Sequence, residues 1–399
     1  MSSNKADQSP KPDSRPRVLV LGGGFAGIGA ARKLRKAEVD VVVIDGHDYH
    51  TFQPLLYQVA TDLLPQGTVG HPLRDLFDDQ PNARVHTTEV NFFGVKGAAE
   101  HAFPLYTLAD AVRLKEHILE RWEAADKDPG LIEDGALNVV VVGGGPTGVE
   151  SAGAIAELYR AIFVKDYPDI GQDKAQIVLV EAGPEIFTMF KPGLRTYARK
   201  ALAGRDVEVL CGQVVDSVTP TRVTLKSGRV IPAHTLVWGA GLQANPVVRS
   251  LGVELQKGNR IPVQPDLSVA GYPEVFAVGD IAWITDGKTD TVLPQLGSVA
   301  LESGRHAGEN TARLAGGDKT EPFTYFDKGT MATIGRGAAV MQGPHGRTMR
   351  GKSAWLAWGA VHLALLSTGE DRAKAVVDWT WAVSTHERAG RITVQTDTK

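Results

Sequence analysis

The sequence predicts an α/β protein that contains two tandem copies of one strand–turn–helix unit and ends in a short helical region. Two segments indicate the duplication, VLVLGGGFAG at residues 18–27 and VVVVGGGPTGVE at residues 139–150. Each reads as a buried apolar strand, a glycine turn and the start of a helix. The copies lie about 120 residues apart, which is too long for a solenoid repeat and fits two domains.

Composition limits the class of protein. With 399 residues, of which 43% are hydrophobic and 22% charged, the chain is long enough for two or three globular domains. A net charge of -3 gives no reason to expect a nucleic-acid partner. The lone Cys211 excludes a disulfide framework and a CxxC redox pair, and it fits a reducing compartment. The sequence has no apolar run of the roughly eighteen residues that a transmembrane helix needs, so none is expected.

In the first copy, RVLVL is a continuous apolar strand of the kind buried in a parallel sheet. Gly22, Gly24 and Gly27 then fit the GxGxxG pattern, and IGAARKLRK continues as a helix. The next strand, VDVVVID, ends at Asp45. An acid about twenty residues after the glycines is where a ribose hydroxyl is held in dinucleotide-binding units.

The second copy repeats this order. Gly143, Gly145 and Gly148 open a helix, and the strand AQIVLVE ends at Glu181. Short strand signals follow over residues 207–232, where KSG suits a hairpin turn, and HTLVWGAG at 234–241 reads as the strand that closes the domain. A further strand, EVFAVGD, is expected to end at Gly279 and Asp280.

The glycine spacing has a physical reason. The first glycine permits a tight turn, the second lets the backbone approach a pyrophosphate, and the third lets the helix pack closely on the strand. The helix N-terminus offers free N–H groups to the phosphates. Because both copies also have the strand, the helix and the acid, we predict two Rossmann-like dinucleotide-binding domains. The two acids favour NADH over NADPH, and two dinucleotides side by side suggest electron transfer from a nicotinamide to a flavin.

Several segments together resemble the type II NADH dehydrogenases, the single-subunit NADH:quinone oxidoreductases. The resemblance runs from about residue 17 to the C-terminus. The segments are GGGFAG, YHTFQPLLYQVAT (49–61), NFFGVKGAAEHAFPLYTLADAVRL (91–114), GGGPTGVE, VFAVGD and YFDKGTMATIGR (325–336).

The resemblance implies FAD in the first copy and NADH as the substrate in the second. The residues expected at FAD are Gly22, Gly24, Phe25, Ala26, Gly27, Asp45, Gln53, Pro54, Leu55, Gly279 and Asp280. Those expected at NADH are Gly143, Gly145, Pro146, Thr147, Gly148, Glu181, Gly239, Ala240 and Gly241. Taken alone, VFAVGD also fits a strand that simply ends in a Gly-Asp turn.

The expected division of the chain follows from these assignments. Residues 1–16 read as a polar, Pro-rich disordered tail, and 124–136 as an exposed linker. The expected domains are 17–123 and 257–325 for the two parts of the FAD-binding domain, 137–256 for the NADH-binding domain and 326–399 for a C-terminal membrane-association region.

Glu150 lies one turn into the helix that follows the second glycine turn. An acid here also fits plain helix electrostatics, which favour it by about 0.3 to 1 kcal/mol. The resemblance implies a place beside the nicotinamide and the flavin ring. We therefore expect Glu150 to help place the nicotinamide or to relay a proton, since hydride transfer itself needs geometry more than a protein acid.

The electron acceptor is narrowed by residues 49–61. Disulfide reductases and sulfide:quinone oxidoreductases need cysteines, and this loop has none. Its apolar residues with Gln53 and Gln58 suit a flat hydrophobic acceptor, although a core segment would look the same. The family places an Ala-Gln-x-x-x-Gln helix at the quinone, and here Ser298 and Glu302 occupy the two glutamine positions. A carboxylate at Glu302 would repel a reduced quinone anion or deliver a proton to it.

The C-terminal region predicts a membrane surface rather than a span. WLAWGAVHLALL at 355–366 is too short to cross a bilayer, and VVDWTWAV at 376–383 is shorter still. Four of the seven tryptophans fall in these two patches with cations around them, as in interfacial helices. A packed cap or a dimer contact fits the same pattern. The expected location is the cytoplasmic face of the inner (plasma) membrane, peripherally bound, and a homodimer is left open. His47 and His50 lack further ligands at suitable spacing, so no metal is expected.

The first domain is predicted to be shortened after Val90, because ARVHTTEV runs straight into NFFGV where the family has a short β meander and a closing strand. A segment on the order of 30 residues is missing, which would leave an open sheet edge. Three functions therefore stay open. The first is a membrane-surface NADH:quinone oxidoreductase without proton pumping, the second a soluble NADH oxidase or diaphorase, and the third a non-catalytic nucleotide-binding relative.

Overall fold

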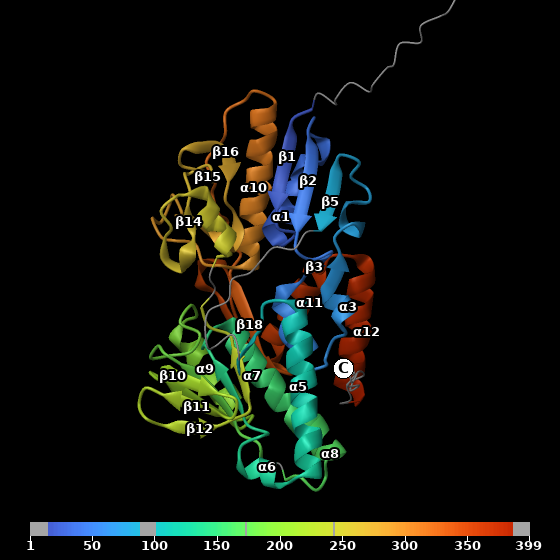
Figure 1. Ribbon diagram of the computed structural model, residues 1–399, viewed down its shortest axis with the longest axis vertical. Helices are drawn as coiled ribbons and strands as arrows, with labels where there is room; N and C mark the ends of the chain where they lie inside the picture. Colours follow the sequence, from blue (N-terminus) through green and yellow to red (C-terminus); the bar gives the residue numbers. More distant parts are fainter. Residues whose placement is uncertain (1–14, 88–100, 172–173, 242–243, 386–399) are drawn as a thin grey trace, which may run out of the picture. The chain divides into compact units, whose positions relative to one another are not determined.

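The computed structural model describes residues 15–87, 101–171, 174–241 and 244–385 (Figure 1). Residues 1–14 of the expected tail (1–16) and residues 88–100 lie outside the described residues. The described chain forms two compact units. Of the described residues, unit 1 comprises 15–50, 72–87 and 244–326, and unit 2 comprises 51–71, 101–171, 174–241 and 327–385.

This division differs from the expected domains in several places, among them residues 244–256, which fall in unit 1, and residues 327–385, which fall in unit 2. Residues 51–71 and 101–123 belong to unit 2, with the second glycine turn, and not to unit 1. The expected linker at 124–136 lies within unit 2, where helix α5 (Leu108–Lys127) runs into it and α6 (Gly130–Glu133) follows. Buried Ile118, Trp122 and Ala125 continue the helical spacing up to that point, so the helix does not stop where charged residues begin.

Unit 1 contains a parallel sheet in the order β1 (Arg17–Leu21), β2 (Asp40–Asp45) and β5 (Ala83–Thr87). Helix α1 (Phe25–Lys33) packs along α10 (Gly297–Ala315), as Figure 1 shows. Glycines make this close packing possible, because a Cβ on Gly304 of α10 would lie 2.0 Å from the Ala26 carbonyl oxygen of α1. The position of α1 therefore fixes the position of α10.

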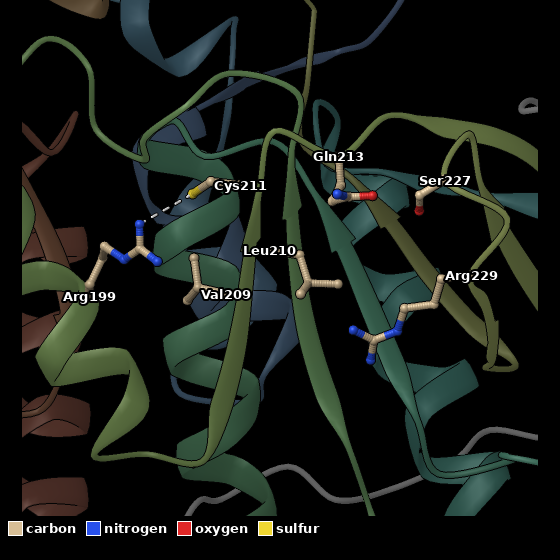
Figure 2. Close-up of a pocket in the computed structure, with 7 residues that line it drawn as sticks. All are labelled: Arg199, Val209, Leu210, Cys211, Gln213, Ser227 and Arg229. Atoms are coloured by element: carbon tan, nitrogen blue, oxygen red, sulfur yellow. Dashed lines mark hydrogen bonds between the residues drawn. The ribbon is translucent and has the colours of Figure 1, made fainter.

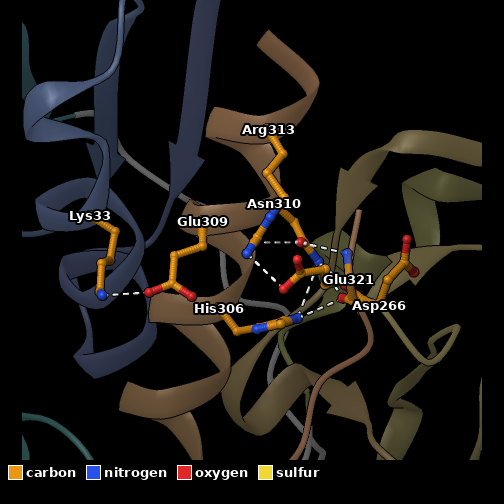
Figure 3. A network of polar contacts seen from close by, with 7 residues as sticks. All are labelled: Lys33, Asp266, His306, Glu309, Asn310, Arg313 and Glu321. Atoms are coloured by element: carbon orange, nitrogen blue, oxygen red, sulfur yellow. Dashed lines mark hydrogen bonds and ion pairs between the residues drawn. The ribbon is translucent and has the colours of Figure 1, made fainter. Parts of the chain in front are cut away.

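The far end of α10 is anchored by buried Asn310 (Figure 3). Its amide nitrogen donates to the carbonyl oxygens of Asp266 (3.0 Å) and Glu321 (2.9 Å), and its oxygen accepts from the Glu321 N–H (2.9 Å). Arg313 and His306 complete the contacts to Glu321. The network ties α10 to the chain at Asp266 and at Glu321. Further strands of unit 1 are β14 (Ile261–Pro262), β15 (Ser268–Val269), β16 (Tyr272–Phe276) and β17 (Ala282–Trp283). The expected EVFAVGD strand ends at Phe276, earlier than predicted, because Gly279 begins a 3-10 turn.

Unit 2 contains a five-stranded parallel sheet. Its order is β6 (Phe103–Pro104), β13 (Thr235–Trp238), β7 (Val139–Val142), β8 (Ile177–Glu181) and β9 (Val207–Cys211). A second, antiparallel sheet follows the predicted hairpin pattern, with β10 (Val215–Thr219), β11 (Arg222–Leu225) and β12 (Val230–Pro232). Its Val223, Leu225 and Ile231 cover one face of the parallel sheet.

The other helices and strands complete the two units. Helix α7 (Pro146–Leu158) packs on an antiparallel sheet of β18 (Thr330–Gly335), β19 (Ala338–Gln342) and β20 (Thr348–Arg350), which the sequence did not predict. The helices are α2 (Leu56–Ala60), α3 (Gln66–Val69), α8 (Val164–Asp166), α9 (Pro192–Ala203), α11 (Lys352–Leu365) and α12 (Gly369–Thr385). Strands β3 (Tyr49–Thr51) and β4 (Gly70–Pro72) pair with each other.

The two parallel sheets differ in what covers them. In unit 2, Val140 and Val142 of β7 are 0% and 8% exposed, beneath the β10–β12 sheet. In unit 1 the corresponding residues of β1 are Leu19 and Leu21. They are 60% and 67% exposed. In the described part of unit 1, β1 pairs only with β2. The shortening of the first domain stays a prediction, because the residues just after Val90 lie outside the described chain.

The difference gives a matched pair of substitutions. Leu19→Thr is expected to change the free energy of unfolding by no more than about 0.5 kcal/mol, because the side chain is largely solvated. Val140→Thr is expected to lower it by about 1 to 3 kcal/mol, because a hydroxyl is then buried among aliphatic groups. Urea denaturation of both variants checks this. Equal losses of stability would show that β1 is covered as β7 is.

Candidate functional site

The first glycine turn joins β1 to α1. Gly22 has φ 100°, which favours glycine, and its N–H donates to the Ile44 carbonyl oxygen at 2.8 Å. A Cβ on Gly27 would lie 1.8 Å from the Gly22 carbonyl oxygen, so helix and turn are in direct contact. A Cβ on Gly24 would meet nothing within 4 Å. The second glycine therefore leaves open space at the start of the helix, where Phe25 and Ala26 follow.

Asp45 is held beside this turn at the end of β2. Its carboxylate accepts from the Gly23 N–H (2.5 Å) and from the His47 N–H (2.8 Å). His50, which the sequence offered only as a weak metal candidate, contacts the turn at Gly23 and Phe25. Its ring Nδ1 is 2.9 Å from the Gly23 carbonyl oxygen, and its ring packs edge-on against Phe25.

Gly279 and Asp280 return to the same turn. Gly279 has φ 67°, and a Cβ there would lie 3.1 Å from the Ala26 Cβ. Its N–H donates to the Ser303 hydroxyl of α10 at 3.1 Å. Burial raises the pKa of Asp280, and the nearby Arg260 partly offsets this. The structure thus brings the VFAVGD segment to the helix that the first GxGxxG opens.

Ser298 and Glu302 lie one turn apart near the start of α10, both half-buried. The Ser298 hydroxyl is 2.9 Å from the Tyr325 hydroxyl. Gly297, just before them, is next to the Phe25 ring, since a Cβ there would be 3.5 Å from it. This pair is therefore close to the start of α1 within unit 1.

The second glycine turn repeats the first. Gly143 has φ 113°, and a Cβ on Gly148 would lie 1.8 Å from the Gly143 carbonyl oxygen. A Cβ on Gly145 would again meet nothing within 4 Å. Pro146 and Thr147 begin α7, and Pro146 needs no N–H partner there.

Glu181 closes this turn as Asp45 closes the first. Its carboxylate accepts from the Gly144 N–H (2.5 Å) and the Gly183 N–H (2.6 Å). The end of β13 lies on the other side, because a Cβ on Gly143 would be 2.9 Å from the Gly239 backbone and 3.1 Å from the Ala240 Cβ. Gly241 follows with φ 68°.

Glu150 is buried in α7, with 8% of it exposed. Its Oε1 accepts from the Thr333 N–H of β18 at 3.0 Å. Burial raises the pKa of Glu150 from 4.5 to about 8, although the Thr333 N–H acts in the opposite direction. A carboxyl group with this pKa holds its proton near neutral pH and can release it above that range.

The predicted loop residues belong to unit 2. Gln53, Pro54 and Leu55 form a 3-10 turn, where Leu55 is 0% exposed. Gln58 is also buried, between Tyr57 and Trp379. Ser298 and Glu302, which were predicted together with Gln58, belong to unit 1.

Helices α11 and α12 form the predicted C-terminal pair, but the tryptophans are not all on the outside. Trp358 is buried and stacks on His362 with ring centroids 4.2 Å apart, and burial lowers the pKa of His362 to about 4. The pair nevertheless exposes many large apolar side chains, which are Leu356, Val361, Leu365, Val376, Val377, Trp381 and Val383. Among the helices that the structure describes, none has the length and apolarity to cross a bilayer.

A pocket of about 460 Å³ lies at the edge strand β9 of the unit 2 sheet (Figure 2). Arg199 and Arg229 flank it. Arg229 forms a double hydrogen bond with Glu208 at 2.7 and 2.9 Å, and Arg199 lies 3.7 Å from the Cys211 sulfur. None of the predicted site residues lines this pocket.

Comparison with known proteins agrees with these two turns. The family model of the pyridine nucleotide-disulphide oxidoreductases matches residues 16–79 and 87–304. The chain is 33% identical to the type II NADH:quinone oxidoreductase Ndh of Mycobacterium tuberculosis over 98% of its own length and 93% of that protein. It is 26% identical to the type II NADH:quinone oxidoreductase of Staphylococcus saprophyticus, over 85% of this chain and 92% of that one.

The fold is likewise shared with a solved structure. NDH2 from Plasmodium falciparum in complex with NADH superimposes with a TM-score of 0.83 at 16% identity, covering 96% of this chain and 100% of that one. The family match, the identity over nearly the whole chain and the common fold lead to one assignment. The chain belongs to the pyridine nucleotide-disulphide oxidoreductases and, within them, to the type II NADH:quinone oxidoreductases.

Proposed function

We propose that this chain is an FAD-dependent oxidoreductase that takes a hydride from NADH and passes two electrons to a quinone at a membrane surface, without pumping protons. The observation that carries the proposal is the pair of glycine turns, each with a strand-end acid hydrogen-bonded to it, and a buried Glu150 in the helix of the second. NADH and FAD each need one such turn.

The residues of both turns fit these nucleotides. At Gly24 and at Gly145 the space that a Cβ would occupy is open, which is the approach a pyrophosphate requires. The N-terminus of each following helix is directed at that space and favours an anion. Both oxygens of Asp45 and of Glu181 accept one backbone N–H each and keep further acceptor capacity for ribose hydroxyls, and the two carboxylates disfavour a 2′-phosphate. When bound, FAD supplies the redox chemistry.

The chain's own residues bind and orient the nucleotides, and one of them holds a proton. Glu181 and the second turn fix the adenosine half of NADH, so its nicotinamide end is placed by the rest of the domain. Glu150 keeps a proton near neutral pH in a buried place. We assign to it the delivery of a proton that a quinone needs when it accepts two electrons. Gln58, Ser298 and Glu302 are proposed for the quinone end.

The membrane surface is proposed from the C-terminal helices. The exposed apolar side chains of α11 and α12, Trp381 among them, form a face suited to the headgroup region of a bilayer. We place the protein peripherally on the cytoplasmic face of the inner membrane, where a lipid-soluble quinone is available. A homodimer that uses the same apolar face is the competing use of that surface.

The test is to purify the protein, record its flavin absorbance, and add NADH with and without a soluble quinone. We expect a yellow protein that NADH bleaches and quinone restores. A colourless protein that cannot take up FAD would point to the non-catalytic relative. A protein bleached by NADH and reoxidised only by oxygen would instead be a diaphorase or NADH oxidase, for which the carboxylate at Glu302 already gives a reason.

Nucleotide preference provides a further prediction. Glu181→Ser is expected to lower kcat/KM for NADH roughly tenfold and to leave NADPH less affected, because a charged acceptor for the ribose is lost. Asp45→Ser is the matched control, since it is expected to weaken FAD retention without changing the ratio of NADH to NADPH. Steady-state kinetics with both nucleotides checks this. An unchanged ratio in Glu181→Ser would contradict the role of the acid.

A further inference from the structure

A line of hydrogen bonds in unit 2 joins helix α12 to Glu150. The Trp379 Nε1–H of α12 donates to Gln58 Oε1 at 2.8 Å, and Gln58 Nε2 donates to the Tyr57 hydroxyl at 2.9 Å. The Tyr57 hydroxyl is 3.1 Å from the Thr333 hydroxyl, and the Thr333 N–H donates to Glu150. We call Trp379, Gln58, Tyr57 and Thr333 the α12 tether.

The chemistry of these groups sets the direction of the two outer bonds. An indole N–H can only donate, so the Gln58 oxygen faces Trp379 and its NH₂ group faces Tyr57. An amide NH₂ can only donate, so the Tyr57 oxygen accepts from Gln58, and in the contact between Tyr57 and Thr333 either hydroxyl can be the donor. The two fixed donors therefore point from α12 toward Tyr57, and the Thr333 N–H is the donor that faces the Glu150 carboxyl group.

Burial makes the arrangement costly to break. Tyr57, Gln58 and Thr333 are 6%, 3% and 4% exposed, so water does not replace a lost partner easily. Trp379 is the outermost member, and its neighbour Trp381 on the same helix is 53% exposed. Helix α12 thus presents an exposed apolar face on one side and the first donor of the tether on the other.

We propose that the α12 tether is a positioning device, in which the seating of α12 orients Thr333 against Glu150 and so governs the proton on that carboxyl group. Tyr57, Gln58 and Trp379 are then positioning residues for Glu150, at 1, 2 and 3 links beyond Thr333. The functional meaning rests on the proton role that the proposed function gives to Glu150. The coupling of α12 to Glu150 through these hydrogen bonds does not depend on that role.

Other groups leave the tether as the principal polar influence on Glu150. Apart from burial, the Thr333 N–H is what shifts its proton affinity, and no charged side chain contributes to that shift. Strand β18 has no titratable residue, and α2 has only Tyr57. Glu157, farther along α7, acts on Tyr57 and is itself engaged by Arg205 at 3.1 Å and by the Arg336 N–H.

The test compares Trp379→Phe with Trp381→Phe, which changes the exposed tryptophan two residues away on the same helix. The readout is the free energy of unfolding from pH 5 to 9, measured in each background with and without Glu150→Gln. The pH-dependent difference between the two reports the proton on Glu150 and needs no catalysis. Trp379→Phe and Tyr57→Phe are expected to move its midpoint upward by up to about one pH unit, because a Thr333 that is held less firmly donates a weaker hydrogen bond to the ionised carboxylate. Trp381→Phe is expected to leave it unchanged.

Equal midpoints in the wild type and in the Trp379→Phe, Tyr57→Phe and Trp381→Phe variants would overturn the proposal. The proposal would also be overturned if Trp379→Phe changed the pH dependence of unfolding when both it and the wild type carry Glu150→Gln. The effect would then arise from another titrating group. Tyr57→Phe keeps the ring and its packing, so it serves if Trp379→Phe folds poorly. If the wild-type protein did not catalyse the reduction of quinone by NADH, the proposed function would be wrong. The unfolding measurement would still show whether α12 is coupled to Glu150.

Discussion

Gly148→Ala is expected to abolish NADH binding and to lower the free energy of unfolding by more than about 3 kcal/mol. A Cβ there would lie 1.8 Å from the Gly143 carbonyl oxygen, and both atoms belong to backbone that cannot rotate away. Relief requires α7 to move off the end of β7, which disrupts the core and the turn together. Helix α7 also holds Glu150, so the damage reaches the proposed proton site.

The matched control is Gly145→Ala. Gly145 has φ -79°, which alanine adopts without strain, and its Cβ would meet nothing within 4 Å. The fold is therefore expected to stay intact, with the free energy of unfolding within about 0.5 kcal/mol of the wild type. The methyl group would instead stand where the pyrophosphate approaches, so NADH affinity is expected to fall about tenfold or more.

Urea denaturation and NADH titration of the flavin absorbance separate the two effects. The pair in the first turn should behave alike toward FAD, because a Cβ on Gly27 would also lie 1.8 Å from a carbonyl oxygen, that of Gly22. Gly27→Ala is expected to yield colourless protein. Normal stability in Gly148→Ala, or unfolding in Gly145→Ala, would contradict the roles given to the two glycines.

The turns could be predicted because their information is local. A glycine pattern, the strand before it and the acid after it lie within about thirty residues, and each has a backbone reason for its spacing. Gly22, Gly143, Asp45 and Glu181 accordingly stand in the geometry that the sequence indicated. The hairpin at Gly228, with φ 87°, follows from the same kind of local rule.

Contacts between distant residues could not be predicted in this way. Thr333 meets Glu150 across 183 positions of the chain, and Trp379 meets Gln58 across 321. No periodicity in the sequence carries such a pairing. The sequence therefore identified Glu150 and Gln58 as candidates but missed the tether that connects them.

The sequence also did not predict which side chains of the short helix α11 face inward. Apolar composition of 355–366 predicted tryptophans facing a membrane, yet Trp358 turns inward and stacks on His362. Helix α11 is apolar on nearly all sides, so its pattern does not distinguish the inner from the outer face. The exposed Leu356 and Leu365 show which side is left for a surface.

Glu150→Gln is expected to stabilise the protein at alkaline pH while it removes the proposed proton donor. The folded-state pKa of about 8 lies above the ordinary 4.5, so the folded state binds the proton more tightly. Below pH 4.5 the carboxyl group is protonated in both states and costs nothing. As the pH rises from 4.5 to 8, the unfolded chain ionises freely and the folded one does not, so stability falls by roughly 4 kcal/mol near pH 8.

Glutamine keeps the shape of the side chain and the acceptor for the Thr333 N–H, but it has no proton to lose. The variant should therefore match the wild type near pH 4.5 and exceed it increasingly toward pH 8, with quinone reduction reduced about 100-fold, the contribution of one general acid. Glu120→Gln, on the exposed face of α5, is the control and should show no such trend. Urea denaturation across this pH range decides the outcome. A constant difference in stability would mean that Glu150 is ionised in the folded protein, and a proton donor would then have to be sought elsewhere.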